Sequence, residues 1–385
     1  MCIAVPASQL AAPAEHGTLV VRHGGVYTGS YRSENSAVPC IRIDTTEPVT
    51  LQGCQLEGAG TLIEATNGGA QLIIRDCTGV GLLPSVDNKP HGRFLEVNSA
   101  RSVRIENNEF SHTSGILIYL WGGDGSAQQT LTVLRNVVRN ADGRFRNGGG
   151  TFATFIGLNG VRGLVNAEIA WNQVINEPNN SRVEDNINFY NSSGTAYSPL
   201  RVHDNYIYGA FPYPATDASY TGSGVTTDGD GDSALTTTAY IEAYHNQLVA
   251  TCAAMNIAAG HDNSFHDNRI VSSGLLPDGT RLKTGYAAIA IWNAYEKPKE
   301  VFHSNRFDHN TIAFYKEGMQ HPFANRHDVN VEACTPCTNT EHLPNPITLQ
   351  TEQHEWDLWQ HKLQAQRASI GPRVALAPKP APQKL

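Results

Sequence analysis

The sequence predicts an all-β, single-domain solenoid: a parallel β-helix with short capping elements and a C-terminal helix. Three observations favour this fold. The 385-residue chain is rich in Asn and contains 35 Gly, and both residue types are poor helix formers. Its hydrophobic content of 40% is enough for a buried core. A short strand-like phrase that ends in Asn or Cys also recurs at variable spacing, as in a solenoid with loops inserted on some turns.

The two ends of the chain differ from this repeated middle. Residues 1–17 are rich in Ala and Pro, so we expect a flexible arm there. The β-helix itself is assigned to residues 18–348. Residues 349–371 are expected to form a helical cap, and the Pro-rich residues 372–385 a flexible tail. The helix is predicted from apolar residues at i, i+3 and i+7: Trp356, Trp359 and Leu363.

Each repeat begins with a short alternating strand that closes on a fixed slot. In Val103-Arg-Ile-Glu-Asn-Asn108, apolar residues alternate with polar ones before the final Asn. Asn tolerates the left-handed backbone of a sharp corner, and its amide can bond to the same amide one coil away, about 4.8 Å along the stack. Small buried thiols would fill the same slot. The predicted slots are Cys54, Cys77, Asn108, Asn136, Asn172, Asn205, Asn246, Asn268 and Asn305.

A second apolar strand follows this phrase in most repeats. Examples are Gly115-Ile-Leu-Ile-Tyr-Leu120 and Asn186-Ile-Asn-Phe-Tyr190. We expect the two strands, with a corner between them, to make one turn of a parallel β-helix. An antiparallel sandwich or a propeller is the alternative. Tight hairpin dipeptides rarely separate the strands, however, and the repeat lengths vary too much for propeller blades.

The coils between about residues 49 and 315 resemble the right-handed parallel β-helix proteins of the pectate-lyase-like superfamily. That resemblance implies carbohydrate handling, usually lysis, hydrolysis or epimerisation of polysaccharides, and a secreted or periplasmic location. The same coils also build non-catalytic surface proteins, so fold alone does not decide the function. Four phrases carry the resemblance: Glu168-Ile-Ala-Trp-Asn-Gln-Val-Ile175, Val183-Glu-Asp-Asn-Ile-Asn188, Ile207-Tyr-Gly-Ala-Phe-Pro212 and Ala259-Gly-His-Asp262.

Polar and aromatic residues follow the second strand in successive repeats, and a solenoid would align them along one flank. Asp228, Asp230 or Asp262 could supply the paired carboxylates of a glycosidase, with His261 supporting a proton relay. Aromatic rings beside them could stack on sugars. A merely polar edge is the alternative. The flank comprises Trp121, Asp124, Asp228, Asp230, Asp232, His261, Asp262, Trp292 and Tyr295.

Further candidates come from other segments. Glu184 and Asp185 precede a strand, so alternation points one of them toward the predicted flank unless Arg182 pairs with it. Arg281 and Lys283 would suit a rival polysaccharide lyase, because β-elimination needs a base and a partner for the uronate carboxylate. Related proteins use Lys or Arg as that base, which is an implication of the resemblance.

One acidic run also predicts a possible metal site. Asp228, Asp230 and Asp232 alternate with Gly, so their oxygens could gather around Ca²⁺, or the run could be an Asx-rich turn. No cofactor is otherwise expected to be required. Cys334 and Cys337 are either a local disulfide or two free thiols.

Charge and hydropathy exclude two classes of partner. A net charge of −8 argues against nonspecific binding to nucleic acid or to anionic membranes. No apolar run approaches the ~20 residues of a membrane span, and the first residues lack a legible signal peptide. The expected partner is a polysaccharide or oligosaccharide. The predicted function is polysaccharide cleavage, with hydrolysis favoured over elimination; the alternative is a non-catalytic glycan-binding or surface-structural β-helix.

Overall fold

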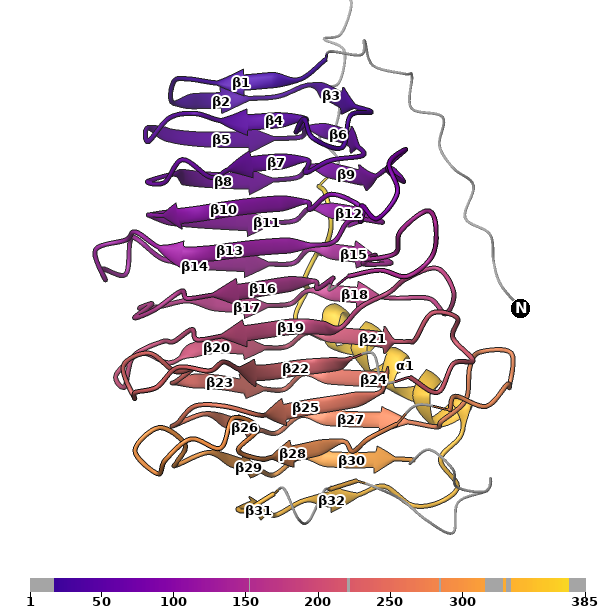
Figure 1. Cartoon of the computed structure of the whole chain (residues 1–385). Helices are drawn as coiled ribbons and strands as arrows, with labels where there is room; N and C mark the ends of the chain where they lie inside the picture. The colour runs from indigo at the N-terminus through magenta and orange to yellow at the C-terminus, as the bar shows by residue number, and fades with distance from the viewer. Residues whose placement is uncertain are drawn as a thin grey trace, which may run out of the picture.

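The protein is a parallel β-helix whose coils stack along one axis from the N-terminal to the C-terminal end (Figure 1). The computed structural model describes residues 17–151, 153–219, 222–283, 285–315, 328–329 and 334–373. Nearly all of the expected arm (1–17) and tail (372–385) therefore lies outside the described residues. Every strand pair in the three sheets is parallel, so each coil bonds to the coil before it and the coil after it.

The first sheet, here called the β1 sheet, positions the candidate site. Its strands read as apolar residues alternating with polar ones, and the apolar set points into the solenoid. The strands are β1 (Leu19–Val21), β4 (Ile41–Ile43), β7 (Ile63–Ala65), β10 (Leu95–Ala100), β13 (Ile116–Trp121), β16 (Ile156–Asn159), β19 (Asp185–Tyr190), β22 (Ser223–Asp228), β25 (Ala253–Ile257) and β28 (Ile289–Ile291).

The second sheet, the β2 sheet, contains the alternating phrases that precede the Asn slots. Its strands are β2 (Gly25–Tyr27), β5 (Pro48–Gln52), β8 (Gln71–Arg75), β11 (Ser102–Glu106), β14 (Leu131–Leu134), β17 (Glu168–Ala170), β20 (Leu200–His203), β23 (Ile241–Tyr244), β26 (Ser264–His266), β29 (Arg306–Asp308) and β31 (Cys337–Thr338).

A third sheet, the β3 sheet, was not predicted: we expected two strands per coil, and there are three. Its strands begin directly after the slot residue and are mostly short. Their apolar residues therefore cannot be told apart in the sequence from the alternating phrase that ends at the slot. They are β3 (Ser30–Ser33), β6 (Gln55–Gly58), β9 (Thr78–Gly81), β12 (Glu109–Ser111), β15 (Val137–Arg139), β18 (Gln173–Ile175), β21 (Tyr206–Ala210), β24 (Gln247–Thr251), β27 (Arg269–Ser272), β30 (Thr311–Phe314) and β32 (Glu341–His342).

The predicted Asn slot forms a continuous buried amide ladder between the β2 and β3 sheets. From Asn108 to Asn268, each side-chain amide donates to the Oδ1 of the next slot at 2.9–3.0 Å. Cys77 and Cys54 continue the ladder, because the backbone N–H of Cys77 donates to Asn108 Oδ1 and that of Cys54 to Cys77 Sγ. The cysteines are therefore buried slot residues, as expected.

The last predicted slot was wrong. Asn268 donates to Asn310, which follows β29, and not to Asn305. Asn305 belongs to a different ladder, in which Asn263 donates to it at 3.0 Å at the corner between the β1 and β2 sheets. The two sites look alike in the sequence because both place Asn after His and another polar residue, and only the strand pairing separates them.

The C-terminal helix α1 (Leu349–Ala365) begins with Thr348, whose side chain and Thr351 form a capping box. We expected it to cap an end of the solenoid. It lies instead along the outer face of the β3 sheet, in contact with β24 and β27 (Figure 1). Trp359 is fully buried there, and its indole N–H donates to Gln173 at 2.9 Å. No helix among the described residues is long and apolar enough to span a membrane.

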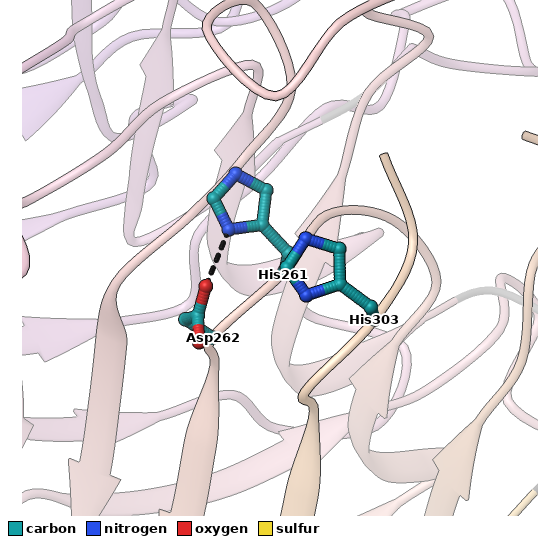
Figure 2. Close-up of side chains that lie close together, drawn as sticks. All are labelled: His261, Asp262 and His303. Atoms are coloured by element: carbon teal, nitrogen blue, oxygen red, sulfur yellow. Dashed lines mark hydrogen bonds and ion pairs between the residues drawn. The ribbon is translucent and has the colours of Figure 1, made fainter. Parts of the chain in front are cut away.

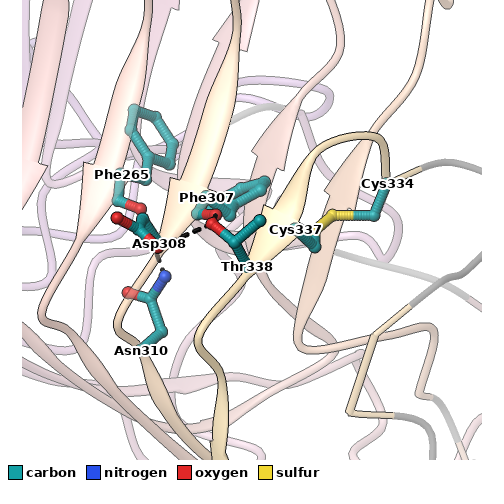
Figure 3. Close-up of a disulfide and its surroundings, with 7 residues drawn as sticks. All are labelled: Phe265, Phe307, Asp308, Asn310, Cys334, Cys337 and Thr338. Carbon is teal, nitrogen blue, oxygen red and sulfur yellow. Dashed lines mark hydrogen bonds between the residues drawn. A yellow bond between two sulfur atoms is a disulfide. The ribbon is translucent and has the colours of Figure 1, made fainter.

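The C-terminal end of the stack is closed by the short strands β31 and β32. Cys334 and Cys337 are joined as a disulfide next to β31, which settles the alternative that the sequence left open (Figure 3). Thr338 in β31 donates to Asp308 at 2.6 Å, and Phe307 packs edge-on against Phe265 one coil earlier. These contacts attach the last short strands to the stack.

Candidate functional site

Three of the predicted acids lie at β19 and β22, which are neighbouring strands of the β1 sheet. Glu184 and Asp185 stand at the start of β19, while Asp228 ends β22, in register with Tyr190 at the end of β19. The negative charges of Asp185 and Asp228 both act on Glu184. The sequence had placed these acids on separate segments, and the winding of the chain brings them to adjacent strands.

Asp185 is the most enclosed of the three and holds a network of neutral donors. Its carboxylate accepts hydrogen bonds from the Ser223 hydroxyl, from Thr226 Oγ1 at 3.1 Å and from Asn188 Nδ2 at 2.9 Å. Burial raises the pKa of Asp185, and the hydrogen bonds from Ser223 and Asn188 act against that rise. No basic side chain among the described residues forms a salt bridge with Asp185 or with Glu184, so the pairing of either acid with Arg182 is not seen.

Glu184 has an acidity unlike that of an ordinary glutamate. Burial, followed by the nearby charges of Asp185 and Asp228, raises its pKa from 4.5 to about 8. The neighbouring strand approaches its backbone very closely: a Cβ on Gly222 would lie 1.1 Å from the Glu184 carbonyl oxygen. Glycine at position 222 is therefore required for the pairing that holds Glu184 beside β22.

Asp228 is held from the other side by an aromatic hydroxyl. Tyr295 Oη donates to Asp228 Oδ1 at 2.5 Å, and the backbone N–H of Gly229 donates to the same oxygen at 2.8 Å. No group among the described residues donates a hydrogen bond to Asp228 Oδ2. The second oxygen of this carboxylate is therefore the one available to a substrate or a water molecule.

The acidic run does not gather its oxygens in this structure. Asp230 accepts from Asn191 Nδ2 at 3.0 Å, and Asp232 pairs with Lys297 at 2.7 Å. Within the described part of the chain, the only three metal-ligating side chains whose donor atoms all lie within 4.8 Å of one another are His261, Asp262 and His303. The different partners of Asp230 and Asp232 do not test calcium binding, so calcium at the run stays a prediction.

The His261 group sits at the corner between the β1 and β2 sheets (Figure 2). His261 Nδ1 lies 2.7 Å from Asp262 Oδ2, and its Nε2 lies 3.0 Å from the Ala234 carbonyl oxygen, so both ring nitrogens have partners. The rings of His261 and His303 are stacked, with centroids 4.8 Å apart and planes 11° apart. Imidazole lone pairs lie in the ring plane, so two stacked rings cannot direct them at one ion. The group is better described as a side-chain ladder.

The other predicted residues of the flank are spread along the stack. Trp121 ends β13 and Asp124 follows it, three strands from β22, or about 14 Å at normal strand spacing. Trp121 packs partly against the core, and Asp124 is exposed and accepts from the backbone of Ser126. Trp292, which is 44% exposed, follows β28, two strands from Asp228 and three from Asp185.

Arg281 and Lys283 lie in the loop that leads into β28, at the opposite end of the strands from Asp228. Arg281 donates through Nε to Tyr315 Oη at 3.1 Å. Lys283 is exposed, and its charge acts on Asp217, where it helps to lower the pKa of that carboxyl after the hydrogen bonds from Ser219. The structure does not group these two cations with Glu184 and Asp228.

Several polar residues of the site were not singled out from the sequence. Asn188 and Tyr190 alternate with the core residues Ile187 and Phe189, so alternation within β19 could have identified them as outward-facing neighbours of Asp228. Asn256, in register with Thr226, is only 8% exposed, yet its Oδ1 has no hydrogen-bond partner among the described residues. A buried acceptor without a donor needs a physical explanation, and a water molecule, an ion or a catalytic role would each provide one.

A pocket of about 400 Å³ opens beside the same sheet nearer the N-terminal end. It is lined in part by Lys89, His91, Arg93 and Glu96. Glu96 lies in β10, which is three strands from β19 in the β1 sheet. Polar and charged groups therefore continue along this face beyond the acids.

The chain was compared with family models, curated proteins and solved structures. No family model, curated protein or solved structure matches it significantly. The functional interpretation therefore depends on the geometry of the site.

Proposed function

We propose that the outer face of the β1 sheet binds a polysaccharide and that Glu184 and Asp228 cleave it by acid–base hydrolysis. One observation supports the proposal most directly. The environment of Glu184 raises its pKa, so Glu184 can act as the acid while Asp228 acts as the second carboxylate. A glutamic acid with a pKa of about 8 still holds its proton at neutral pH and can protonate a glycosidic oxygen. This is the property that a glycosidase requires of its general acid.

Asp228 is the matching second carboxylate. Tyr295 and Gly229 both bond to its Oδ1, which orients the carboxylate and leaves Oδ2 free to activate water or to attack the sugar. Asp185 is buried under three neutral donors, so its role is to position the site and to raise the pKa of Glu184. Trp292 and Tyr190 would provide ring surfaces for the sugars.

We also propose a superfamily, a cellular location and a polymeric substrate for the protein. The parallel coils resemble the pectate-lyase-like superfamily, a secreted location would suit a polysaccharide substrate, and the length of the face would suit a polymer. Elimination through Arg281 or Lys283 is less favoured, because Asp228 acts electrostatically on both Glu184 and Asp185, whereas neither cation does so.

The test is a panel of neutral and acidic polysaccharides incubated with the full chain. Reducing ends report hydrolysis, and ultraviolet absorbance of unsaturated uronates reports elimination. We expect Glu184→Gln and Asp228→Asn each to lower kcat by about 10²–10⁴-fold on the cleaved polymer. The matched control is Asp232→Asn, a carboxylate in the same loop that pairs with Lys297, and it should keep kcat within about twofold.

Three results would contradict the proposal. Binding of a polymer without any bond cleavage would identify a glycan-binding protein instead. Unsaturated products would identify a lyase. Activity that survives both Glu184→Gln and Asp228→Asn would place the chemistry elsewhere on the solenoid.

A further inference from the structure

A second site lies on a different sheet of the solenoid from the acids, where helix α1 rests on the β3 sheet. A pocket of about 360 Å³ opens between the first two turns of α1, the outward side chains of β18 and β21, and the loop that contains Pro277. Its volume falls within the range of pockets that hold small molecules. The helix and the sheet therefore leave a small-molecule space between them.

Aromatic rings form much of the wall of this pocket. Tyr206 and Tyr208 stand on β21 two residues apart, so both point outward from the sheet. Trp356 on α1 meets Tyr206 edge-on, with ring centroids 5.3 Å apart and planes 72° apart. Burial raises the pKa of both phenols, so the rings are neutral and present their π faces and hydroxyl groups to the space.

One carboxyl group shares the pocket with these rings. Glu352 is only 5% exposed, and its Oε1 accepts the backbone N–H of Ser273 at 2.6 Å. No basic side chain among the described residues forms a salt bridge with Glu352. Burial raises the pKa of Glu352 to about 7, because its charged form is costly without a cation beside it, and a bound cation would favour that charged form.

Two basic side chains near the pocket are already paired. Arg269, in register with Gln247 and so two strands from Tyr206, makes a bidentate salt bridge to Glu355. Arg139, in register with Ile175, pairs with Glu109. The negative charge of Glu352 acts on both tyrosines, and that of Glu177 on Tyr208, alongside the larger effect of burial. The pocket is therefore electronegative as well as aromatic.

We propose that this pocket binds a small organic cation, an ammonium head group held between the rings of Tyr206, Tyr208 and Trp356 and the carboxylate of Glu352. Aromatic faces attract cations through the ring quadrupole, and the attraction is larger in desolvated sites. A neutral sugar would leave the charge of Glu352 uncompensated, and an anion would be repelled by it. This site is separate from the polysaccharide face, so the inference does not depend on the proposed enzymatic activity.

Choline and its neutral isostere 3,3-dimethylbutan-1-ol distinguish charge from shape, because they differ chiefly in the charged nitrogen. Titration of the full chain, followed by calorimetry and ligand-detected NMR, should show choline binding at least tenfold more tightly than the isostere. Glu352→Gln keeps an acceptor for the Ser273 N–H and removes the charge, so it should weaken choline binding about tenfold or more.

Tyr208→Leu tests the ring contribution and should weaken choline binding severalfold. Its matched control is Tyr197→Leu, because Tyr197 is 80% exposed and lies outside the pocket, and this variant should bind choline as the unmodified protein does. Circular dichroism of each variant establishes that the β-helix is intact. Equal binding of choline and the isostere would overturn the proposal, as would choline binding that both pocket variants leave unchanged, or no binding of choline at millimolar concentration.

Discussion

At the scale of single residues, the protein separates the acidities of neighbouring carboxyl groups by the environment of each. Glu184 is partly buried beside two other acids, which raises its pKa to about 8. Exposed Asp230 lies close by in sequence to Asp228, but hydrogen bonds from Asn191 and Tyr190 lower its pKa. The difference follows from burial and from the donors each carboxylate finds.

The contribution of Glu184 to the free energy of unfolding should therefore fall as the pH rises. Between the ordinary pKa of 4.5 and about 8, the folded chain holds a proton on Glu184 that the unfolded chain has lost. Raising the pH through this window removes that proton at a cost to the folded state. Glu184→Gln has no such group, so we expect it to gain about 1–2 kcal/mol over the unmodified protein from about pH 5 to about pH 9, after allowing for partial exposure. Urea midpoints at both pH values measure the change.

The control for that experiment is Glu300→Gln, which alters an exposed glutamate on the loop after β28. Its stability relative to the unmodified protein should not depend on pH. If Glu184→Gln shows the same flat difference as Glu300→Gln, the carboxyl group of Glu184 has an ordinary pKa, and its role as general acid is lost with it.

At the scale of elements, the sequence predicted the slots better than the strands. The Asn-ending phrases gave the repeat because a buried corner accepts few side chains, and Asn108 through Asn268 all lie where expected. The β3 sheet was missed because a strand such as Gln173–Ile175 starts one residue after its slot. Asn305 was misassigned because its sequence neighbours match the pattern, whereas its partner Asn263 is known only from the winding.

The ladder makes a measurable contribution to stability. Asn172 donates to Asn205 and to the Val133 carbonyl, and it accepts from both the backbone and the side chain of Asn136. Asn172→Ala leaves those buried groups unpaired, so we expect a loss of about 2–4 kcal/mol in the free energy of unfolding. Denaturant titration measures it.

Asn159 provides the comparison, since it lies on the preceding strand of the same coil and its side-chain amide makes no hydrogen bond to any described residue. We expect Asn159→Ala to cost no more than about 0.5 kcal/mol. Equal losses for the two variants would mean that the ladder fills space without adding hydrogen-bond stability.

At the scale of the whole molecule, the C-terminal segment runs back along the solenoid. Helix α1 crosses β18, β21, β24 and β27, and the chain after it reaches earlier coils: Gly371 N donates to the Arg135 carbonyl and Arg373 N to Asp76 (Figure 1). The helix was predicted from the spacing of Trp356, Trp359 and Leu363. Its docking was not, because the face that receives it is assembled from one residue on each of four strands: Gln173, Tyr206, Gln247 and Arg269.

A coil in a solenoid contacts only its neighbours, so damage to one part should stay local unless an element crosses many coils. Helix α1 is such an element for the C-terminal half. Trp359→Ala removes a fully buried ring that stacks on Trp171 at 6.2 Å, and it should weaken the docking of α1 by about 3–5 kcal/mol. Hydrogen exchange should then rise in β18, β21, β24 and β27, while β6 and β9 exchange as before. Trp292→Ala, which removes a ring that is 44% exposed, should change neither group. A uniform rise over all coils would show that the solenoid opens as one cooperative unit and that the helix does not brace a particular part of it.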